Sequence, residues 1–216
     1  MGENHSLSIG EAEACSGQRG KQFALFMCFG FLLVGVVGTL LGPILPMLAA
    51  KWQVGDAEVS WLFVAQFSGG IIGSALSGRM IARVGLLRLL TYGYAATAAA
   101  VACLGVSSWA IGLLSVFCFG FTLGLTGPVM SLLMAEVYPN RRAVALNVLG
   151  LAWALGAVAG PPMIALLARD GGLIRPLGGL VMMLLGVASL IAWRALVDSP
   201  LWIRSAGPEP QKSGAP

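Results

Sequence analysis

Charged residues are scarce in this chain. They make up 10% of its 216 residues, whereas 57% are apolar. A soluble globular domain carries about 25% charged residues. This shortage excludes an ordinary soluble domain, and the net charge of +4 forms no basic patch that would indicate a nucleic-acid partner.

Acidic residues and histidine are rarer still. The nine Asp and Glu residues lie in predicted loops, tails or helix ends, and the one histidine, His5, lies in the N-terminal tail. Catalytic triads, metal clusters and phosphate loops are missing from the sequence, so we expect no enzyme activity, no metal and no cofactor. Proton relays use a buried carboxylate or histidine. We therefore expect any coupling carboxylate to lie in a partner, or transport to be facilitated diffusion.

Cysteines number only four, and three of them (Cys28, Cys103 and Cys118) fall in apolar stretches. Nothing in their spacing is typical of a secreted disulfide framework or of a metal site. We interpret the three as small apolar fillers.

Long apolar runs dominate what remains. Six of them, each near the roughly 20 residues that cross a bilayer, predict transmembrane helices. Their ranges are 22–49, 59–80, 86–107, 110–135, 144–168 and 177–197. The first carries Pro43 and Pro46 near its far end, where we expect it to bend. The predicted fold is an all-α membrane bundle.

The distribution of Lys and Arg predicts the orientation of the bundle. With the N-terminus inside, the inner segments hold ten of these residues and the outer loops hold three, namely Lys51, Arg169 and Arg175. We therefore predict both termini in the cytoplasm, with a tail at 1–21 and a partly disordered tail at 198–216. The expected location is a plasma membrane, the inner membrane of a bacterium, with the lipid bilayer as a partner.

A weak internal repeat relates the first three predicted helices to the last three. Leu40–Leu45 aligns with Leu125–Met130 at an offset of 85, and Gly70 aligns with Gly156 at 86. Because three helices are an odd number, the second unit is inverted in the membrane, as in known transporter repeats.

Three degenerate motifs occur in order along the chain. The loop between the second and third predicted helices contains Gly78, Arg79, Arg83, Gly85 and Arg88. The loop after the fourth contains Glu136, Pro139, Arg141 and Arg142, and the fifth helix contains Gly156, Gly160 and Pro161. With six spans around them, the chain resembles the N-terminal six-helix half of a major facilitator superfamily transporter.

The first motif is similar to the family signature Gly-x-x-x-Asp-Arg-x-Gly-Arg-Arg, but it departs from it at one important position. Gly78, Arg83 and Gly85 match, whereas Ala82 stands where the family has Asp. In the family this Asp belongs to a charge network that helps to hold the outward-open state. Its replacement puts ordinary gating in doubt.

Other stretches resemble particular branches of the family. Asn147 and Trp153, together with Gly42–Pro46, are similar to fucose-permease-like members, and Asp198–Ile203 is similar to sugar porters. Gly156–Pro161 is similar to a motif common in antiporters. The resemblance therefore implies a small organic solute, either sugar-like or a drug or metabolite.

The resemblance also implies a missing half, because family members usually have twelve helices in two halves of the same orientation. We expect a half-size transporter that works by alternating access with a second copy or a separate C-terminal-half chain. The alternative is a non-transporting membrane fragment or an accessory protein.

Polar side chains inside the predicted spans are the candidates for a solute cavity, because an unpaired amide in hydrocarbon is costly. The candidates are Gln66, Thr122, Thr126, Asn147 and Trp153. Small residues four apart, such as Gly38/Gly42, Gly69/Gly73, Gly120/Gly124 and Gly156/Gly160, predict close helix packing, with sliding along these faces as a second interpretation.

Overall fold

The structure is a computed structural model that describes residues 23–106, 108–168 and 172–197. The predicted tails at 1–21 and 198–216 lie outside the described residues. The described chain consists of helices and the turns between them. In order they are Phe23–Gly38, α2 (Leu41–Trp52), α3 (Asp56–Val59), α4 (Trp61–Val84), α5 (Leu86–Val106), α6 (Trp109–Val137), the 3-10 turn η1 (Pro139–Arg141), α7 (Arg142–Leu167) and α8 (Ile174–Val197).

The helices match the predicted membrane spans. Five are long and apolar enough to cross a bilayer, and the bent pair of Phe23–Gly38 and α2 makes a sixth. The prediction of an all-helical membrane bundle is confirmed. The helix ends differ from prediction by a few residues: α4 continues to Val84, and α8 begins at Ile174.

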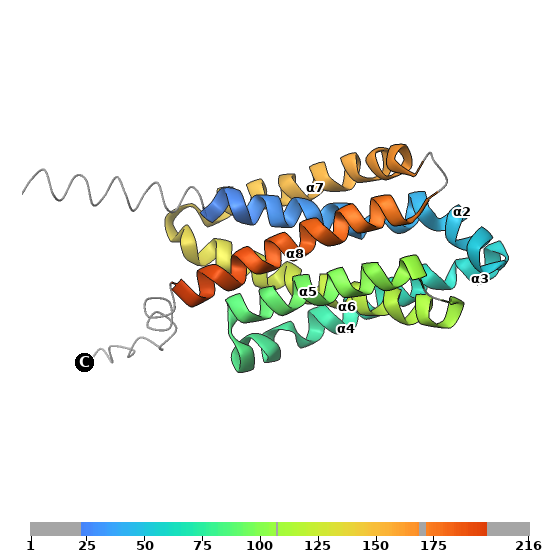
Figure 1. The fold of residues 1–216 in the computed structure, drawn as a ribbon. Coiled ribbons are helices and arrows are strands. Elements are labelled where there is room, and N and C mark those ends of the chain that lie inside the picture. The colour runs from blue at the N-terminus through green and yellow to red at the C-terminus, as the bar shows by residue number, and fades with distance from the viewer. Residues whose placement is uncertain (1–22, 107, 169–171, 198–216) are drawn as a thin grey trace, which may run out of the picture.

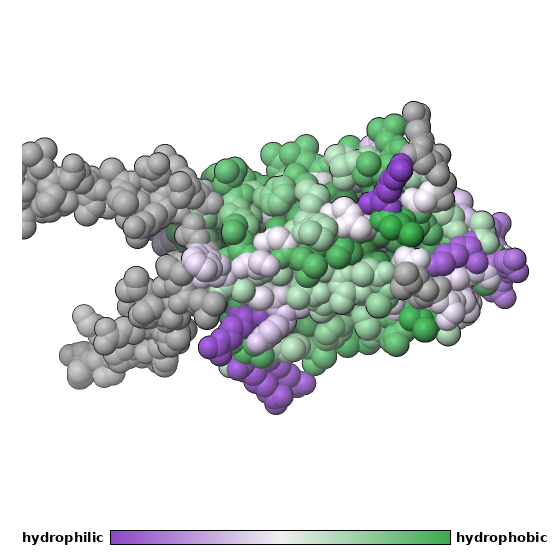
Figure 2. Space-filling model, in the orientation of Figure 1, coloured by the Kyte–Doolittle hydropathy of each residue, from purple (hydrophilic) through white to green (hydrophobic). Residues whose placement is uncertain are grey.

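The helices run up and down, so their connections gather at two ends (Figure 1). One end, which we call the terminal end, carries Phe23, the α4–α5 turn, the α6–α7 connection and the end of α8. The opposite end carries α3 and is called the α3 end. Figure 2 shows an apolar belt between hydrophilic residues at the two ends, as expected for a bundle that crosses a bilayer.

The first span bends by 42° between Phe23–Gly38 and α2, with Thr39 and Leu40 in a turn. Pro43 lacks the N–H that would bond to the carbonyl of Thr39, and its ring clashes with that carbonyl. Pro46, also inside α2, removes a second such bond, to Gly42. The predicted bend is therefore present, but it lies just before Pro43 rather than at Pro43–Pro46.

The far end of the bent span is anchored at the α3 end. The Nζ of Lys51 donates to the carbonyl of Gly105 at 2.7 Å and lies 3.3 Å from that of Leu104, so it caps the last turn of α5. The Trp52 ring meets the Trp109 ring edge to face, with centroids 5.6 Å apart. These contacts hold α2 in place although the helix before it is broken.

The helices α4 and α6 pack backbone to backbone. A methyl group added at any of four glycines would overlap the backbone of the facing helix, so only glycine fits there. The glycines, each with the residue whose carbonyl it faces, are Gly69 (Phe117), Gly73 (Phe121), Gly120 (Gln66) and Gly124 (Gly70). This reciprocal contact is the close approach that small residues permit between helices in lipid.

The first helix and α7 pack in the same way. Gly35 lies against the carbonyl of Trp153 and Gly156 against that of Leu32, again with no space for a methyl group. A Cβ on Gly160 would lie 3.2 Å from the Cα of Val36, which is tight but less severe. Two parallel helix pairs thus share one type of contact.

The two pairs are equivalent under the inverted repeat. Adding 85 to a number in the first helix gives its counterpart in α6, so that Gly35 corresponds to Gly120. Adding 87 to a number in α4 gives its counterpart in α7, so that Gly69 corresponds to Gly156. The sequence pairing of Gly70 with Gly156 was therefore wrong by one residue, since Gly69 makes the equivalent contact.

Burial is uneven around the bundle. In the most apolar 18-residue windows, 44% of residues are buried in α5 and in α6, but only 28% in α4 and 22% in α7. Fully buried side chains such as Tyr94 and Phe119 lie on α5 and α6. The helices α4 and α7 therefore present the least covered faces of the bundle.

Candidate functional site

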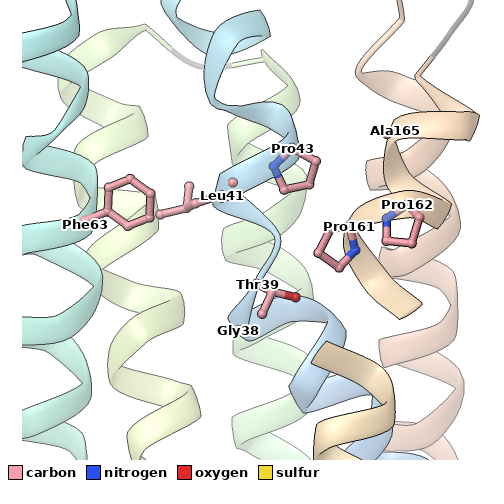
Figure 3. Close-up of a pocket in the computed structure, with 9 residues that line it drawn as sticks. Gly38, Thr39, Leu41, Pro43, Phe63, Pro161, Pro162 and Ala165 are labelled. Atoms are coloured by element: carbon pink, nitrogen blue, oxygen red, sulfur yellow. The ribbon is translucent and has the colours of Figure 1, made fainter. Parts of the chain in front are cut away.

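A groove opens beside the bend of the first span, and we call it the break groove (Figure 3). It has a volume of about 620 Å³ and is open to the outside of the bundle. Its lining comes from the first helix, α2, α4 and α7, and consists of Gly38, Thr39, Leu41, Gly42, Pro43, Phe63, Pro161, Pro162 and Ala165. It thus lies across the face between the two least covered helices.

A second open hollow, the α4–α6 groove, has a volume of about 590 Å³. It runs along the glycine contact between α4 and α6. Its lining consists of Gln66, Phe67, Gly70, Ile71, Ser74, Ala75, Gly120, Leu123 and Gly124. Gln66 connects the two grooves, because its side chain also reaches the bend of the first span.

Polar groups that the bend exposes find partners on α4 and α7. The side-chain amide of Gln66, which is buried, donates to the carbonyl of Gly38 at 3.0 Å. The Thr39 hydroxyl lies 3.1 Å from the carbonyl of Gly35 and 3.4 Å from that of Ala157. In a bilayer a freed backbone group must be satisfied by protein, and Gln66 does this for the carbonyl of Gly38.

Prolines supply the other polar feature of the break groove. Pro161 and Pro162 lack the N–H groups that would bond to the carbonyls of Ala157 and Val158. Pro43 similarly leaves the carbonyl of Thr39 without its helical donor. The lining residues carry no formal charge. Of these three carbonyls, only that of Thr39 belongs to a residue that lines the groove, so the groove combines apolar walls with a candidate backbone acceptor at the bend.

Thr39 marks the one difference between the two glycine-packed pairs. Under the repeat it takes the place of Gly124, which lies directly on the carbonyl of Gly70. The equivalent carbonyl in α7 belongs to Ala157, and the Thr39 hydroxyl lies 3.4 Å from it. A side chain therefore replaces a backbone contact where the break groove opens.

The structure separates the five predicted cavity residues. Thr122 and Thr126 are buried, and Thr122 Oγ1 lies 2.7 Å from Thr97 Oγ1 on α5, so these residues join α5 to α6 in this conformation. Gln66 lines the α4–α6 groove. Asn147 is exposed, and Trp153 is 41% exposed on α7. A role in solute binding stays a prediction for all five.

The predicted motifs occupy the terminal end and α7. Gly85, with φ of 85°, ends α4 in a conformation that favours glycine, whereas Gly78 has open space where a Cβ would lie. Gly156 and Gly160 pack against the first helix, and Pro161 lines the break groove. Exposed residues at the terminal end complete the set: Arg79, Arg83, Arg88, Glu136, Pro139, Arg141 and Arg142.

Sequence reasoning missed Thr39, Phe63 and Pro162 as groove residues. It used Pro43 and Pro46 only to predict a bend and did not ask which side chains the bend would uncover. It also expected Gly38 and Gly42 to pack closely, whereas neither has an atom of another helix within 4 Å of its Cβ position. The signal in the sequence was that Thr39, Gly38 and Gly42 lie directly beside Pro43, where the helix was predicted to bend.

Comparisons with known proteins agree with this architecture. The family profile of the Major Facilitator Superfamily matches residues 27–215. An uncharacterized MFS-type transporter of Yersinia pestis (strain Pestoides F) is 36% identical over 143 residues, which cover 65% of this chain and 36% of the relative. An uncharacterized MFS-type transporter of Yersinia pseudotuberculosis serotype O:1b (strain IP 31758) gives the same values. The aligned part thus spans just over a third of the length of these relatives.

Proposed function

The chain belongs to the major facilitator superfamily, and on that basis we propose that it takes part in moving a small organic solute across a membrane by alternating access. The observation that carries the proposal is the break groove, an open, uncharged hollow at a bent helix between the two least covered helices. Interrupted helices line the binding sites of several transporter families, because their freed backbone groups can contact the solute.

The second part of the proposal is that this bundle works with another six-helix unit, either a second copy or a separate chain. Large apolar side chains stand out from the two faces beside the groove, with Phe67 65% and Ile71 71% exposed on α4 and Val158 76% exposed on α7. A second unit against these faces would turn the open grooves into a closed central cavity. Such units share one orientation, so two copies need no inversion.

The solute class follows from the lining of the grooves. A carboxylate or phosphate would need a cation beside it, and neither groove is lined by one. Apolar walls and a candidate carbonyl acceptor at the bend favour an uncharged donor-bearing molecule, sugar-like or a drug or metabolite. Gln66 and Trp153 are the side chains we propose to contact it, with Asn147 nearer the terminal end and Thr122 and Thr126 available only if α5 and α6 separate.

The orientation is also a proposal. The excess of Lys and Arg at the terminal end, including Arg79, Arg83 and Arg88, supports the proposal that both termini lie in the cytoplasm and that the bundle crosses a bacterial inner membrane. A cysteine-reactive probe that cannot cross the membrane tests this in a cysteine-free background. A cysteine at position 57 in α3, where Ala57 is exposed, should react from outside, and one at Gly78 should not.

A non-transporting fragment or accessory protein remains the second candidate. The observation that favours it is Ala82, which replaces the acidic residue of the family's gating network. Deletion of the chain distinguishes the two. A half-transporter should lose uptake of its solute on deletion, and the same loss should follow deletion of its partner chain. Unchanged uptake across a panel of labelled sugars, polyols and neutral metabolites would favour the fragment.

A further inference from the structure

Three arginines at the terminal end have no partner among the described residues. Arg79 and Arg83 lie in the last turns of α4, and Arg88 lies in the first turn of α5. All three are exposed, and none makes a hydrogen bond or ion pair with another described residue. Each guanidinium carries five N–H donors, none of which is used by another described residue.

The chain places these three charges on either side of the α4–α5 turn. Arg79 and Arg83 are one helical turn apart, a spacing that places side chains on the same face of a helix. Gly85 then reverses the chain with its positive φ, so that α5 starts at Leu86 and brings Arg88 back to the same end. The α4–α5 turn lies at the terminal end (Figure 1), and hydrophilic residues border the apolar belt at that end (Figure 2), which is the depth of lipid headgroups.

Among the described residues, no acidic side chain pairs with these arginines. Asp56 and Glu58 lie in α3 at the opposite end. Glu136 lies near the end of α6, is exposed, and forms no ion pair with an arginine among the described residues. Position 82, between Arg79 and Arg83 on the same helix, is Ala. The cluster is thus built of cations alone.

We propose that Arg79, Arg83 and Arg88 form a binding site for the headgroup of an anionic phospholipid. A guanidinium binds a phosphate through two parallel N–H···O bonds, and the headgroup phosphate is the anion available at this depth. A general attraction of cations to an anionic membrane would not depend on which arginines are present. Binding at a defined site, by contrast, should depend on Arg79, Arg83 and Arg88 and not on other arginines at the same end. The proposal is independent of whether the chain transports a solute.

Native mass spectrometry of the full chain in detergent, titrated with phosphatidylglycerol, tests the site. The R79Q/R83Q variant removes two cluster charges, and R141Q/R142Q removes two exposed arginines at the same end as a matched control. Each contact near the headgroup is worth roughly a fivefold change in affinity. We expect R79Q/R83Q to weaken phosphatidylglycerol binding by about tenfold or more, the control by no more than about twofold, and phosphatidylcholine binding to be unchanged.

Three outcomes would overturn the proposal. Equal losses in the two double variants would mean diffuse attraction, and unchanged binding in R79Q/R83Q would mean that another group, such as an acidic residue of the chain's own tails, occupies the arginines. Displacement of phosphatidylglycerol by millimolar inorganic phosphate at constant ionic strength would mean a site for soluble anions. The variant R79K/R83K keeps the charge that insertion requires, and its binding should fall between wild type and R79Q/R83Q because Lys cannot form the paired bonds.

Discussion

The pair formed by α4 and α6 and the pair formed by the first helix and α7 share one design, and they differ at one position. Three of the four close contacts are glycine in both pairs, but Gly124 of α6 corresponds to Thr39 of the first span. The α6 helix continues through Pro128, whereas the first span bends by 42° beside Thr39. The closely packed pair and the pair beside the break groove are therefore two versions of the same repeated unit, which differ at Gly124 and Thr39.

Two residues explain why only one of the paired helices bends. Both carry a proline at the equivalent position, Pro43 and Pro128, so that proline alone does not produce the bend. The first span adds Pro46, whose counterpart in α6 is Ser131, and Thr39 keeps the backbone from the close contact that Gly124 makes. The backbone contact with α4 continues along α6 to Gly124, whereas beyond Val36 the first span meets α7 through the Thr39 side chain instead.

The largest expected effect comes from breaking the rigid pair. The variant G73A places a methyl group on the carbonyl of Phe121, so the helices must separate. We expect the free energy of unfolding to fall by about 2–4 kcal/mol, measured by denaturant titration in detergent. The control G78A lies on the same helix with open space, and it should be neutral or stabilising by up to about 1 kcal/mol. Equal effects of the two would refute the close contact.

A smaller loss is expected in the second pair. In G156A the new methyl group meets the carbonyl of Leu32, as severely as in the first pair. Because α7 is the least covered helix, it can shift at lower cost, and we expect a loss of about 1–2 kcal/mol. The control is G150A, at a site with free space on α7. A loss larger than that of G73A would reverse the ranking of the two pairs.

Substitution of Thr39 by Gly should make the second pair resemble the first. We expect the far ends of α2 and α7 to move together and the break groove to shrink, with the stability changed by less than about 1 kcal/mol. Spin labels at Ala50 and Leu166, both exposed, in a cysteine-free background would report a shorter distance. An unchanged distance would show that the prolines alone set the groove.

An effect of similar size is expected from loss of the hydrogen bond between Gln66 on α4 and the bend. The variant Q66L removes the donor that satisfies the carbonyl of Gly38, at a cost of about 1 kcal/mol. The control S68A loses only a bond to its own helix, from Ser68 to Ala65, and should change stability less. If Q66L is as stable as S68A, a water molecule in the groove or another donor of the protein satisfies the carbonyl instead.

The smallest effect is expected on the other side of the first helix. Tyr94 packs its ring end against Gly30, and its hydroxyl is buried with no hydrogen-bond partner among the described residues. Removal of an unpaired hydroxyl leaves the packing intact, so Y94F should change the free energy of unfolding by no more than about 0.5 kcal/mol, in the stabilising direction. A loss above about 1 kcal/mol would reveal a partner that this conformation does not contain.

Hydropathy was sufficient to predict the membrane spans, because a span is defined by a long apolar run. The order of the motifs along the chain was sufficient to predict the family. The register of the repeat was predicted one residue off, since Gly69 and Gly70 are adjacent and only the contact with Phe117 tells them apart. Thr122 and Thr126 were predicted to line a cavity because they are polar, but a threonine hydroxyl can bond to its own helix or to Thr97 and stay buried. Which face a helix turns inward cannot be predicted from its composition.

Native mass spectrometry of the purified chain in nanodiscs, over a range of protein concentrations, tests most directly whether this bundle is half of a transporter. The proposed function predicts two six-helix units in one particle, either a dimer of this chain or a complex with a second six-helix chain, so that the grooves beside α4 and α7 close into one cavity. A single copy at every concentration of the purified chain would contradict it, provided that the chain also carries no second six-helix partner when it is extracted directly from its native membrane.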